Sequence, residues 1–378
     1  MRLLRSLHAW SGLVLAVLAV VLGLSGALLV FEADYLRAKF PAARAAAPLD
    51  AASLAQVAEA AGQTFPQQIR SIVLARPELG LHQVYLTDGG GAYLDGHGAV
   101  VDRWSKSAPF EIWLFELHEE LLAGETGHVV AGIAGLAFML MAITGLILWT
   151  PVRRSFGGHV WPSSSARRHL LAQHRDVGVL TALPILLFSL TGVAMVFSAP
   201  VRTALTWILP GGPSSDLAAP ALPPLPRERE VDWTRVLTAA QQRFPEAELR
   251  VVAWPGANGG PVSVRLKQPA EWHPNGRTRV LAAAATGEIL YAHDASRDTL
   301  PARAYNALYP LHAARIGGRA YDLLSLLSGL ALTLLGSFGA WSYAKRLYSR
   351  SQDRRAQAAA SAIEAATSPT GRPGGTRG

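Results

Sequence analysis

Four of the eleven histidines in this 378-residue chain stand at matched positions in two halves of the sequence. His8 and His174 each open the pattern H-x3-G-x12-[ST]-G-x3-V-F, which repeats without a gap. His118 and His312 are each followed, at the same spacings, by glycines and by a Gly-Leu-Ala element. Such self-similarity indicates an internal duplication, so residues that persist in both copies are candidates for a shared chemical role.

The chemistry that such pairs could perform is metal ligation by imidazole. Neutral imidazoles from opposite helices can ligate a haem iron on both axial faces, which blocks oxygen binding and favours electron transfer. We expect His8 with His174 to hold one haem and His118 with His312 to hold another. Because the chain has no cysteine, c-type attachment is excluded and two non-covalent b-type haems are expected. The alternative, that each is an interfacial histidine at a membrane end, is disfavoured by the matching of the pairs.

Other residues near these histidines could support a haem, although no catalytic residue is identified. His169 lies five residues before His174 and is a reserve ligand for that site. Nearby arginines could hold haem propionates through bidentate pairs, and these are Arg5, Arg175, Arg315 and Arg319. The repeated glycines could leave room for a flat macrocycle or could serve ordinary helix packing, and these are Gly12, Gly26, Gly178 and Gly192. Surface positions are expected for unmatched histidines, namely His82, His97, His159, His273 and His293.

The elements that must position the four histidines are membrane helices. Half of the residues are hydrophobic and 16% are charged, which is typical of a membrane protein rather than a soluble enzyme. Four apolar stretches are long enough to cross a hydrocarbon core, which takes about 20 helical residues: approximately 12–31, 129–149, 177–199 and 323–343. The predicted fold class is a membrane all-α four-helix bundle, built by parallel internal duplication, with two small α+β domains outside the membrane.

Basic residues predict the orientation. Arginine and lysine are concentrated before the first span, between the second and third, and after the fourth, and such residues mark the cytoplasmic side. Both termini are then cytoplasmic in a bacterial inner membrane, and segments 32–117 and 200–311 are periplasmic. The net charge of +8 is therefore interpreted as a topology signal, and no nucleic-acid partner is expected.

Each periplasmic segment repeats an amphipathic helix pattern followed by alternating, strand-like stretches. The predicted organisation comprises membrane helices at 8–31, 111–150, 174–199 and 305–346, small domains at 49–108 and 230–295, and a disordered cytoplasmic tail at 351–378. The second and fourth helices are expected to carry periplasmic extensions.

These motifs resemble the PepSY-associated transmembrane family. The resemblance rests on four elements: Leu7–Gly12 entering the first helix, Leu117–Gly127 before the second, His174 and Arg175 with Gly178, and Leu311 and His312 with Gly317 and Gly318. The second copy departs from the first where Arg319 replaces Glu125. The resemblance implies PepSY-like outer domains. It also implies similarity to iron-regulated inner-membrane proteins and ferric-siderophore reductases, which carry two b-type haems.

The function expected from these observations is electron transfer across the membrane, with reduction of a periplasmic ferric siderophore or other ferric chelate. No nucleotide-binding fingerprint is visible, so a quinol or a separate cytoplasmic reductase would donate the electrons. Outer aromatic residues could contact the chelate, namely Tyr85, Trp104, Trp113, Trp254 and Trp272. The alternatives are a transporter and a non-catalytic PepSY-type regulator or sensor in the membrane, with lipid as the surrounding partner in every case.

Overall fold

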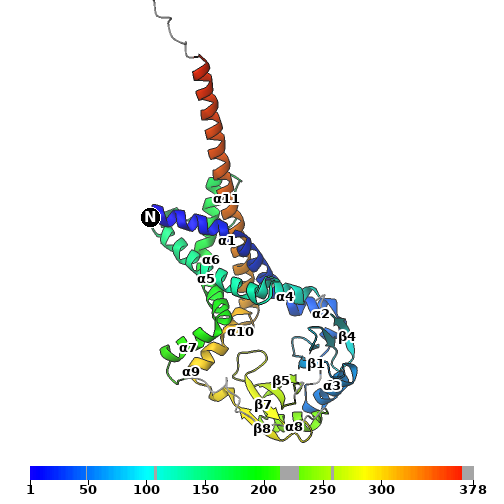
Figure 1. Cartoon of the computed structure of the whole chain (residues 1–378). Coiled ribbons are helices and arrows are strands. Elements are labelled where there is room, and N and C mark those ends of the chain that lie inside the picture. Colours follow the sequence, from blue (N-terminus) through cyan, green and yellow to red (C-terminus); the bar gives the residue numbers. More distant parts are fainter. Residues whose placement is uncertain (48, 106–108, 213–229, 257–258, 368–378) are drawn as a thin grey trace, which may run out of the picture. The chain divides into compact units, whose positions relative to one another are not determined.

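Helices make up most of the chain. A computed structural model describes residues 1–47, 49–105, 109–212, 230–256 and 259–367 (Figure 1). Among these residues, four helices are long and apolar enough to cross a membrane. They are α1 (Arg2–Leu29), α5 (Gly124–Trp149), α6 (Arg167–Val196) and α11 (Gly318–Thr367). The chain is therefore a membrane protein with an additional antiparallel sheet.

The chain divides into two compact units, and each of the four long helices contributes to both. The first unit comprises Met1–Val20, Leu140–Ala182 and Ala331–Gly378. It contains the start of α1 and α6, the end of α5, the short helix η2 (Thr150–Ser155) and the later part of α11. Small residues let helices approach closely here, as they do in membrane proteins generally. A Cβ built on Gly336 would lie 2.9 Å from Cβ of Ala19.

The second unit, Val21–Met139 with Leu183–Leu330, contains an antiparallel sheet of eight strands. The strands are β1 (Ile69–Val73), β2 (His82–Leu86), β3 (Gly91–Leu94), β4 (Val100–Trp104), β5 (Glu248–Ala253), β6 (Val262–Lys267), β7 (Thr278–Ala282) and β8 (Ile289–His293). Their order is β4-β3-β2-β1-β5-β6-β7-β8, which is symmetrical about the β1–β5 pair.

The strands expected in two separate small domains thus join in one sheet. Ser71 pairs with Ala253, and Val73 with Val251, where β1 meets β5. Each of these strands would otherwise present an open edge with unpaired backbone groups, and their pairing removes both edges.

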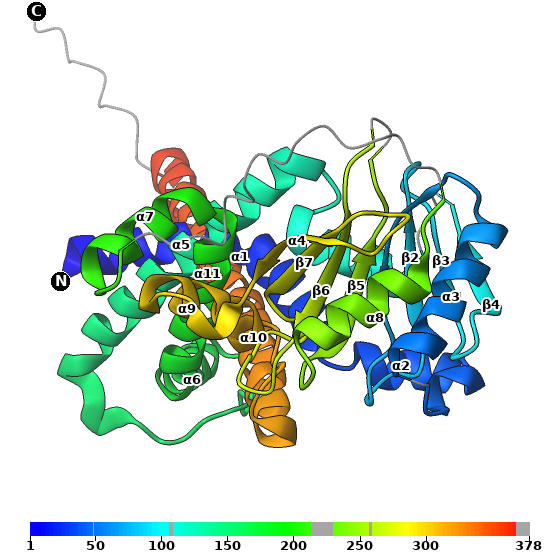
Figure 2. The same ribbon diagram turned by 90° about the horizontal axis from the view of Figure 1, so that it is seen from below.

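One core connects the two halves of the sheet. Helices α3 (Ala51–Thr64) and α8 (Trp233–Arg243) lie side by side over the same face (Figure 2). Each helix begins at an aspartate whose side chain accepts a backbone N–H, Asp50 in α3 and Asp232 in α8. Fully buried apolar residues under them include Leu54, Val57, Ile72, Val84, Val236, Leu237, Val252 and Val264.

Shorter helices lie between the long helices and the sheet strands in the sequence. These are α2 (Glu32–Lys39), η1 (Pro41–Arg44), α4 (Phe110–Glu120), α7 (Ser198–Ile208), η4 (Ala295–Arg297), α9 (Leu300–Asn306) and α10 (Leu308–His312). The single extended helix expected over 111–150 is in fact two, because Leu121, Leu122 and Gly124 take positive φ angles that end α4 before α5 begins. Ala314, Gly317 and Gly318 break the chain in the same way between α10 and α11, so the helix expected over 305–346 is also interrupted.

Two further expectations require correction. Residues 351–367, expected to be disordered, continue α11 as helix, because alanine, arginine and glutamine there favour helix; residues 368–378 lie outside the described residues. Three histidines expected at the surface are buried, with exposed fractions of 0% for His82, 7% for His273 and 8% for His293. Each has a polar or aromatic neighbour that makes burial tolerable, such as the backbone N–H of Ala75, which donates to Nδ1 of His82.

Candidate functional site

The first histidine pair lies in the sheet-containing unit. His118 near the end of α4 and His312 at the end of α10 have ring centroids 6.0 Å apart, with 41° between the ring planes. Both histidines precede the positive-φ turns that lead into membrane helices, so the turns fix where the two rings meet. Burial lowers the pKa of His118 to about 4, with a further contribution from His312, and burial also lowers the pKa of His312. Both imidazoles are therefore neutral at ordinary pH, as metal ligation requires.

The second pair lies in the other unit. His8 on α1 and His174 on α6 have ring centroids 6.3 Å apart, with 81° between the ring planes. His169 is not part of this contact. Its side chain is half-buried, with Nδ1 at 2.7 Å from Oγ of Ser164 and with Nε2 accepting from Arg168.

Hydroxyl groups set the tautomer of His118 and His8. Oγ of Ser25 donates to the carbonyl of Val21 at 2.6 Å, so it must accept from Nδ1–H of His118, 3.0 Å away. Oγ1 of Thr144 donates to its own helix backbone and lies 2.9 Å from Nδ1 of His8. With the proton on Nδ1, the lone pair of each ring is on Nε2.

His312 is held in the same tautomer by a carbonyl. The oxygen of Phe188, which can only accept, lies 3.0 Å from its Nδ1, and Oγ1 of Thr191 lies 3.1 Å away. His174 differs, because its buried Nδ1 has no side-chain hydrogen-bond partner among the described residues. In the repeat, Phe338 occupies the position that corresponds to Thr144, so no hydroxyl is available there.

A glycine packs against each of the four histidine rings. A Cβ on Gly26 would lie 2.8 Å from Cε1 of His118, and one on Gly192 would lie 3.0 Å from Cε1 of His312. Gly145 packs in the same way beside His8, and Gly339 beside His174. A Cβ on either glycine would lie 3.5 Å from Cε1 of the histidine. Both glycine pairs correspond in the repeat, so the contact between glycine and histidine occurs twice in each unit.

The glycines weighed from the sequence therefore divide into two groups. Gly26 and Gly192 back the histidine rings, whereas Gly12 faces Met141 and Gly178 faces Leu335. The first two make room for the imidazoles, and the other two are ordinary helix-packing positions.

The ring spacing fits one metal atom between each pair. A metal–imidazole bond of about 2.0 Å, with roughly 1.1 Å from ring centre to nitrogen, separates two trans-ligating rings by about 6 Å between centres. The observed separations are 6.0 and 6.3 Å. No cluster of three or more histidine, cysteine, aspartate or glutamate side chains suited to a metal occurs among the described residues. A pair alone suits a metal whose other ligands come from its own macrocycle, as in haem.

Three of the four arginines proposed as propionate contacts have carboxylate partners in the chain. Arg175 bonds Asp176 at 2.6 Å, and Arg315 bonds Glu32 at 2.8 Å. Arg319 bonds Asp34 at 3.0 Å. The first pair lies within α6, whereas the other two connect to α2. A propionate would have to share the guanidinium groups with these carboxylates. The fourth, Arg5, lies on the first turns of α1, and its contact with a propionate stays a prediction.

The hydroxyl and glycine partners were only partly visible in the sequence. Ser25 and Thr191 correspond within the duplicated pattern, and that match could have assigned them to the histidines. Thr144 has no hydroxyl counterpart in the second half, so only its three-dimensional position reveals its role.

Comparison with known families agrees with the motif analysis. A family model described as the PepSY-associated TM region matches residues 5–346, which includes all four paired histidines. No curated protein sequence matches the chain.

Proposed function

The chain belongs to the PepSY-associated TM family, and from that premise we propose that it is a membrane electron-transfer protein with two b-type haems, which reduces a ferric chelate. The observation that supports this most directly is the duplicated pair of imidazoles. Three of the four imidazoles are set in the Nδ1–H tautomer, and both pairs have the spacing for one metal atom between them.

Haem bound at these positions would supply a one-electron redox couple. His8 with His174, and His118 with His312, would each supply two imidazoles to one haem iron, because the rings of each pair come from different helices. Ser25, through its hydrogen bond to Nδ1, orients the ring of His118 and raises the basicity of its other nitrogen. An iron held by two imidazoles would favour electron transfer over the binding of oxygen.

We place the protein in a bacterial inner membrane with both termini in the cytoplasm. Arg2 and Arg5 lie in the first turns of α1, before its apolar stretch, and Arg153 and Arg154 follow α5, as expected for cytoplasmic ends. On this topology His8 and His174 lie toward the cytoplasm, and the PepSY-like sheet lies in the periplasm with His118 and His312. The repeated glycine contacts support the parallel duplication on which this assignment rests.

The substrate we propose is a ferric siderophore or another ferric chelate in the periplasm, with a quinol or a separate cytoplasmic reductase as donor. Family resemblance supplies the substrate class, and the sheet supplies a folded surface for docking.

A transporter is not favoured by the buried acid in α6. Asp176 is fully buried, but its Oδ2 accepts from the backbone N–H of Gly157 and of His159, and its Oδ1 accepts from Arg175. A carboxylate bonded in this way anchors the segment before α6, whereas an ion path requires an acid that can exchange its partners.

Haem stoichiometry tests the proposal. The purified chain should bind two haems by pyridine haemochrome assay, and His8→Ala, His174→Ala, His118→Ala and His312→Ala should each reduce the ratio to one. His169→Ala is the matched control and should keep two. A chain that binds no haem, or that loses none in any of the four variants, would refute the proposal.

Direction can be tested separately. Chemically reduced protein is placed in sealed, oriented vesicles, and ferric citrate is added to one side. Reoxidation is expected when the chelate meets the sheet-bearing face. Reoxidation only from the opposite face would overturn the assigned topology of the reaction.

A further inference from the structure

A cavity of about 360 Å³ lies between the loop that joins β6 to β7 and helix α9. Its walls include Trp272, His273 and Arg277 from the loop, and Arg303, Asn306 and Ala307 from α9 and its end. Small-molecule pockets measure about 300–1,000 Å³. This cavity can therefore hold a small chelate or one arm of a larger one.

The cavity exists because the two halves of the sheet differ. Ten residues, 268–277, join β6 to β7, whereas four residues, 87–90, join the corresponding strands β2 and β3. Insertions on a rigid scaffold commonly carry binding functions. Only the second half of the sheet has this wall, so the cavity is not explained by the repeat itself.

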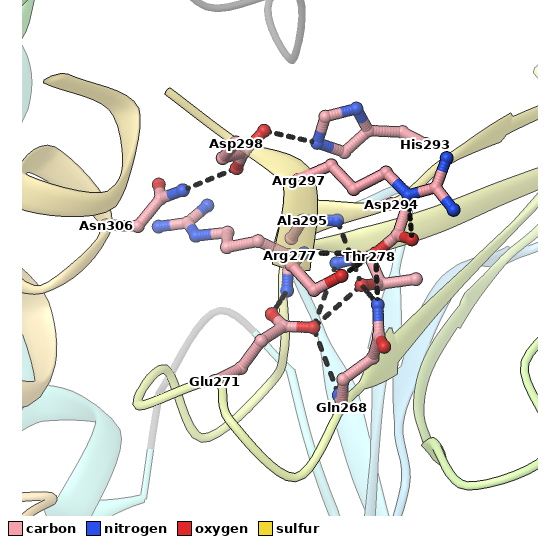
Figure 3. Close-up of polar contacts among 11 residues, drawn as sticks. Gln268, Glu271, Arg277, Thr278, His293, Asp294, Ala295, Arg297, Asp298 and Asn306 are labelled. Carbon is pink, nitrogen blue, oxygen red and sulfur yellow. Dashed lines mark hydrogen bonds and ion pairs between the residues drawn. The ribbon is translucent and has the colours of Figure 1, made fainter. Parts of the chain in front are cut away.

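The longer loop is held in one conformation by its own hydrogen bonds (Figure 3). The carboxylate of Glu271 accepts from the backbone N–H of Gln268 at 3.0 Å and from Oγ1 of Thr278 at 2.7 Å, and it also accepts from the backbone N–H of Arg277. The amide of Gln268 donates to Oγ1 of Thr278 and to Asp294. Glu271 is thus committed to the loop, and the wall is formed before any ligand arrives.

The cavity wall carries two arginines, Arg277 and Arg303, and two acids, Glu271 and Asp298, and both acids already accept hydrogen bonds within the chain. Arg303 is exposed at its rim and makes no ion pair among the described residues. Figure 3 shows the Arg277 side chain extending toward Asn306 and Asp298. Burial, together with the charges of Arg277 and neighbouring arginines, lowers the pKa of His273 to about 3. A carboxylate that enters the cavity can pair with Arg303 at the rim, because a guanidinium fork matches a carboxylate in geometry.

The cavity also adjoins the helix that carries a paired histidine. The ring of His273 packs on Tyr309 of α10 at 5.0 Å between centroids, and His312 ends the same helix. Ala307, in the cavity wall, is the residue from which α10 starts. Trp272, at the rim, is 57% exposed and offers an aromatic face to a ligand.

We propose that this cavity is the docking site for a carboxylate-bearing ferric chelate, with Arg303 and Arg277 binding its carboxylates and Trp272 covering it. The proposal rests on the proposed function, because it specifies the substrate class of that reaction. It assigns the docking surface to the second half of the sheet and to the side of His312.

Calorimetry with gallium citrate tests the site. Gallium(III) has the charge and oxygen coordination of ferric iron but is not reduced, so binding is measured without electron transfer. The full chain in detergent should bind gallium citrate, and Arg303→Gln should weaken binding by roughly tenfold through loss of a charge-assisted hydrogen bond. Arg277→Gln should weaken it as well.

Arg297→Gln is the matched control. Arg297 lies on the neighbouring turn, but its side chain is 85% exposed and bonds Asp294, outside the cavity wall. The Arg297→Gln variant should bind gallium citrate with the same affinity as the unmodified chain. Equal affinity in all three variants, or no binding to the unmodified chain, would overturn the docking site.

The docking site and the proposed electron-transfer function can fail independently of each other. A chain that binds gallium citrate through Arg303 but contains no haem would keep the site and refute electron transfer. A chain with two haems, reoxidised by ferric citrate equally in Arg303→Gln, Arg277→Gln and the control, would keep electron transfer and refute the site.

Discussion

Nδ1 of His118 and the hydroxyl of Ser25 form a hydrogen bond of 3.0 Å in which the serine can only accept. Its own proton is used in a bond to the carbonyl of Val21, one turn earlier on α1. A side chain on one helix thereby fixes the protonation and orientation of a ring on another. This places Ser25 among the residues that determine how well the first pair can hold a metal.

Replacing Ser25 with alanine should weaken haem binding at the His118 and His312 pair. Loss of a partner to a ligating histidine commonly lowers metal affinity by about 10- to 100-fold. Haem occupancy should fall from two toward one during dilution, measured by absorbance. Ser337→Ala, which removes an exposed hydroxyl bonded to its own helix, should leave occupancy at two. If Ser25→Ala and Ser337→Ala retained haem equally, Ser25 would have no role in holding the His118 ring for haem binding.

Glycine-to-alanine substitutions should show which histidine rings pack tightly against their glycines and which have room to move. A Cβ at position 26 would approach Cε1 of His118 to 2.8 Å and must push the ring aside, whereas one at position 145 would reach only 3.5 Å from His8. Gly26→Ala should therefore lose haem from one pair, while Gly145→Ala keeps both haems. The check is the haemochrome ratio of each variant. Two haems in Gly26→Ala would show that the ring has room to move.

Phe338→Thr should supply the hydroxyl that His174 lacks. A hydrogen bond of about 1 kcal/mol to Nδ1 would make the imidazole a stronger donor and would lower the haem potential by roughly 40 mV. Phe338→Val is the matched control, since it has the shape of threonine without the hydroxyl. Spectroelectrochemical titration should show the downward shift in the threonine variant alone. Identical potentials in both variants would argue against a hydrogen bond to His174.

Acid should destabilise the sheet through His82. Burial lowers the pKa of this histidine from 6.5 to about 4, against an opposing effect of Asp95. The unfolded chain therefore binds a proton that the folded chain excludes. Stability is fully present above pH 6.5 and is lost as the pH falls toward 4, by about 2 kcal/mol at pH 5.

Thermal unfolding of the full chain at pH 7.5 and pH 5 would measure this loss. His82→Asn keeps an acceptor near the N–H of Ala75 but does not titrate, so its melting temperature should fall less between the two pH values. An equal fall in the variant and the unmodified chain would assign the acid sensitivity to other groups.

Much of the helical architecture could be predicted from the sequence because apolar length and histidine spacing are local signals. The four candidate spans follow from hydropathy, and the duplicated pattern predicted which histidines would pair in each unit. The breaks at Leu121 and Leu122 could not be predicted in the same way. Leucine rarely takes a positive φ, and here tertiary packing overrides its local preference.

The strand order of the sheet and the lining of the cavity could not be predicted from the sequence, because both depend on contacts between residues far apart in the chain. Nothing in the strands themselves shows that β1 chooses β5 as its neighbour, because alternating patterns predict a face but not a partner. Burial of His82 and His273 likewise depends on residues distant in sequence. Among the outer aromatic residues, Trp254 packs on Trp233 in the core, whereas Trp272 lines the cavity.

The pairing of β1 with β5 also imposes an order of events on synthesis. About 180 residues separate Val73 from Val251, and two candidate membrane helices, α5 and α6, lie between them in the sequence. At a translation rate of about 5–20 residues per second, the first strand waits roughly 10–35 seconds for its neighbour. During that interval its edge is open to other chains. The edge of β1 is therefore open to mispairing only until β5 has been made, and the folded protein shows no trace of this interval.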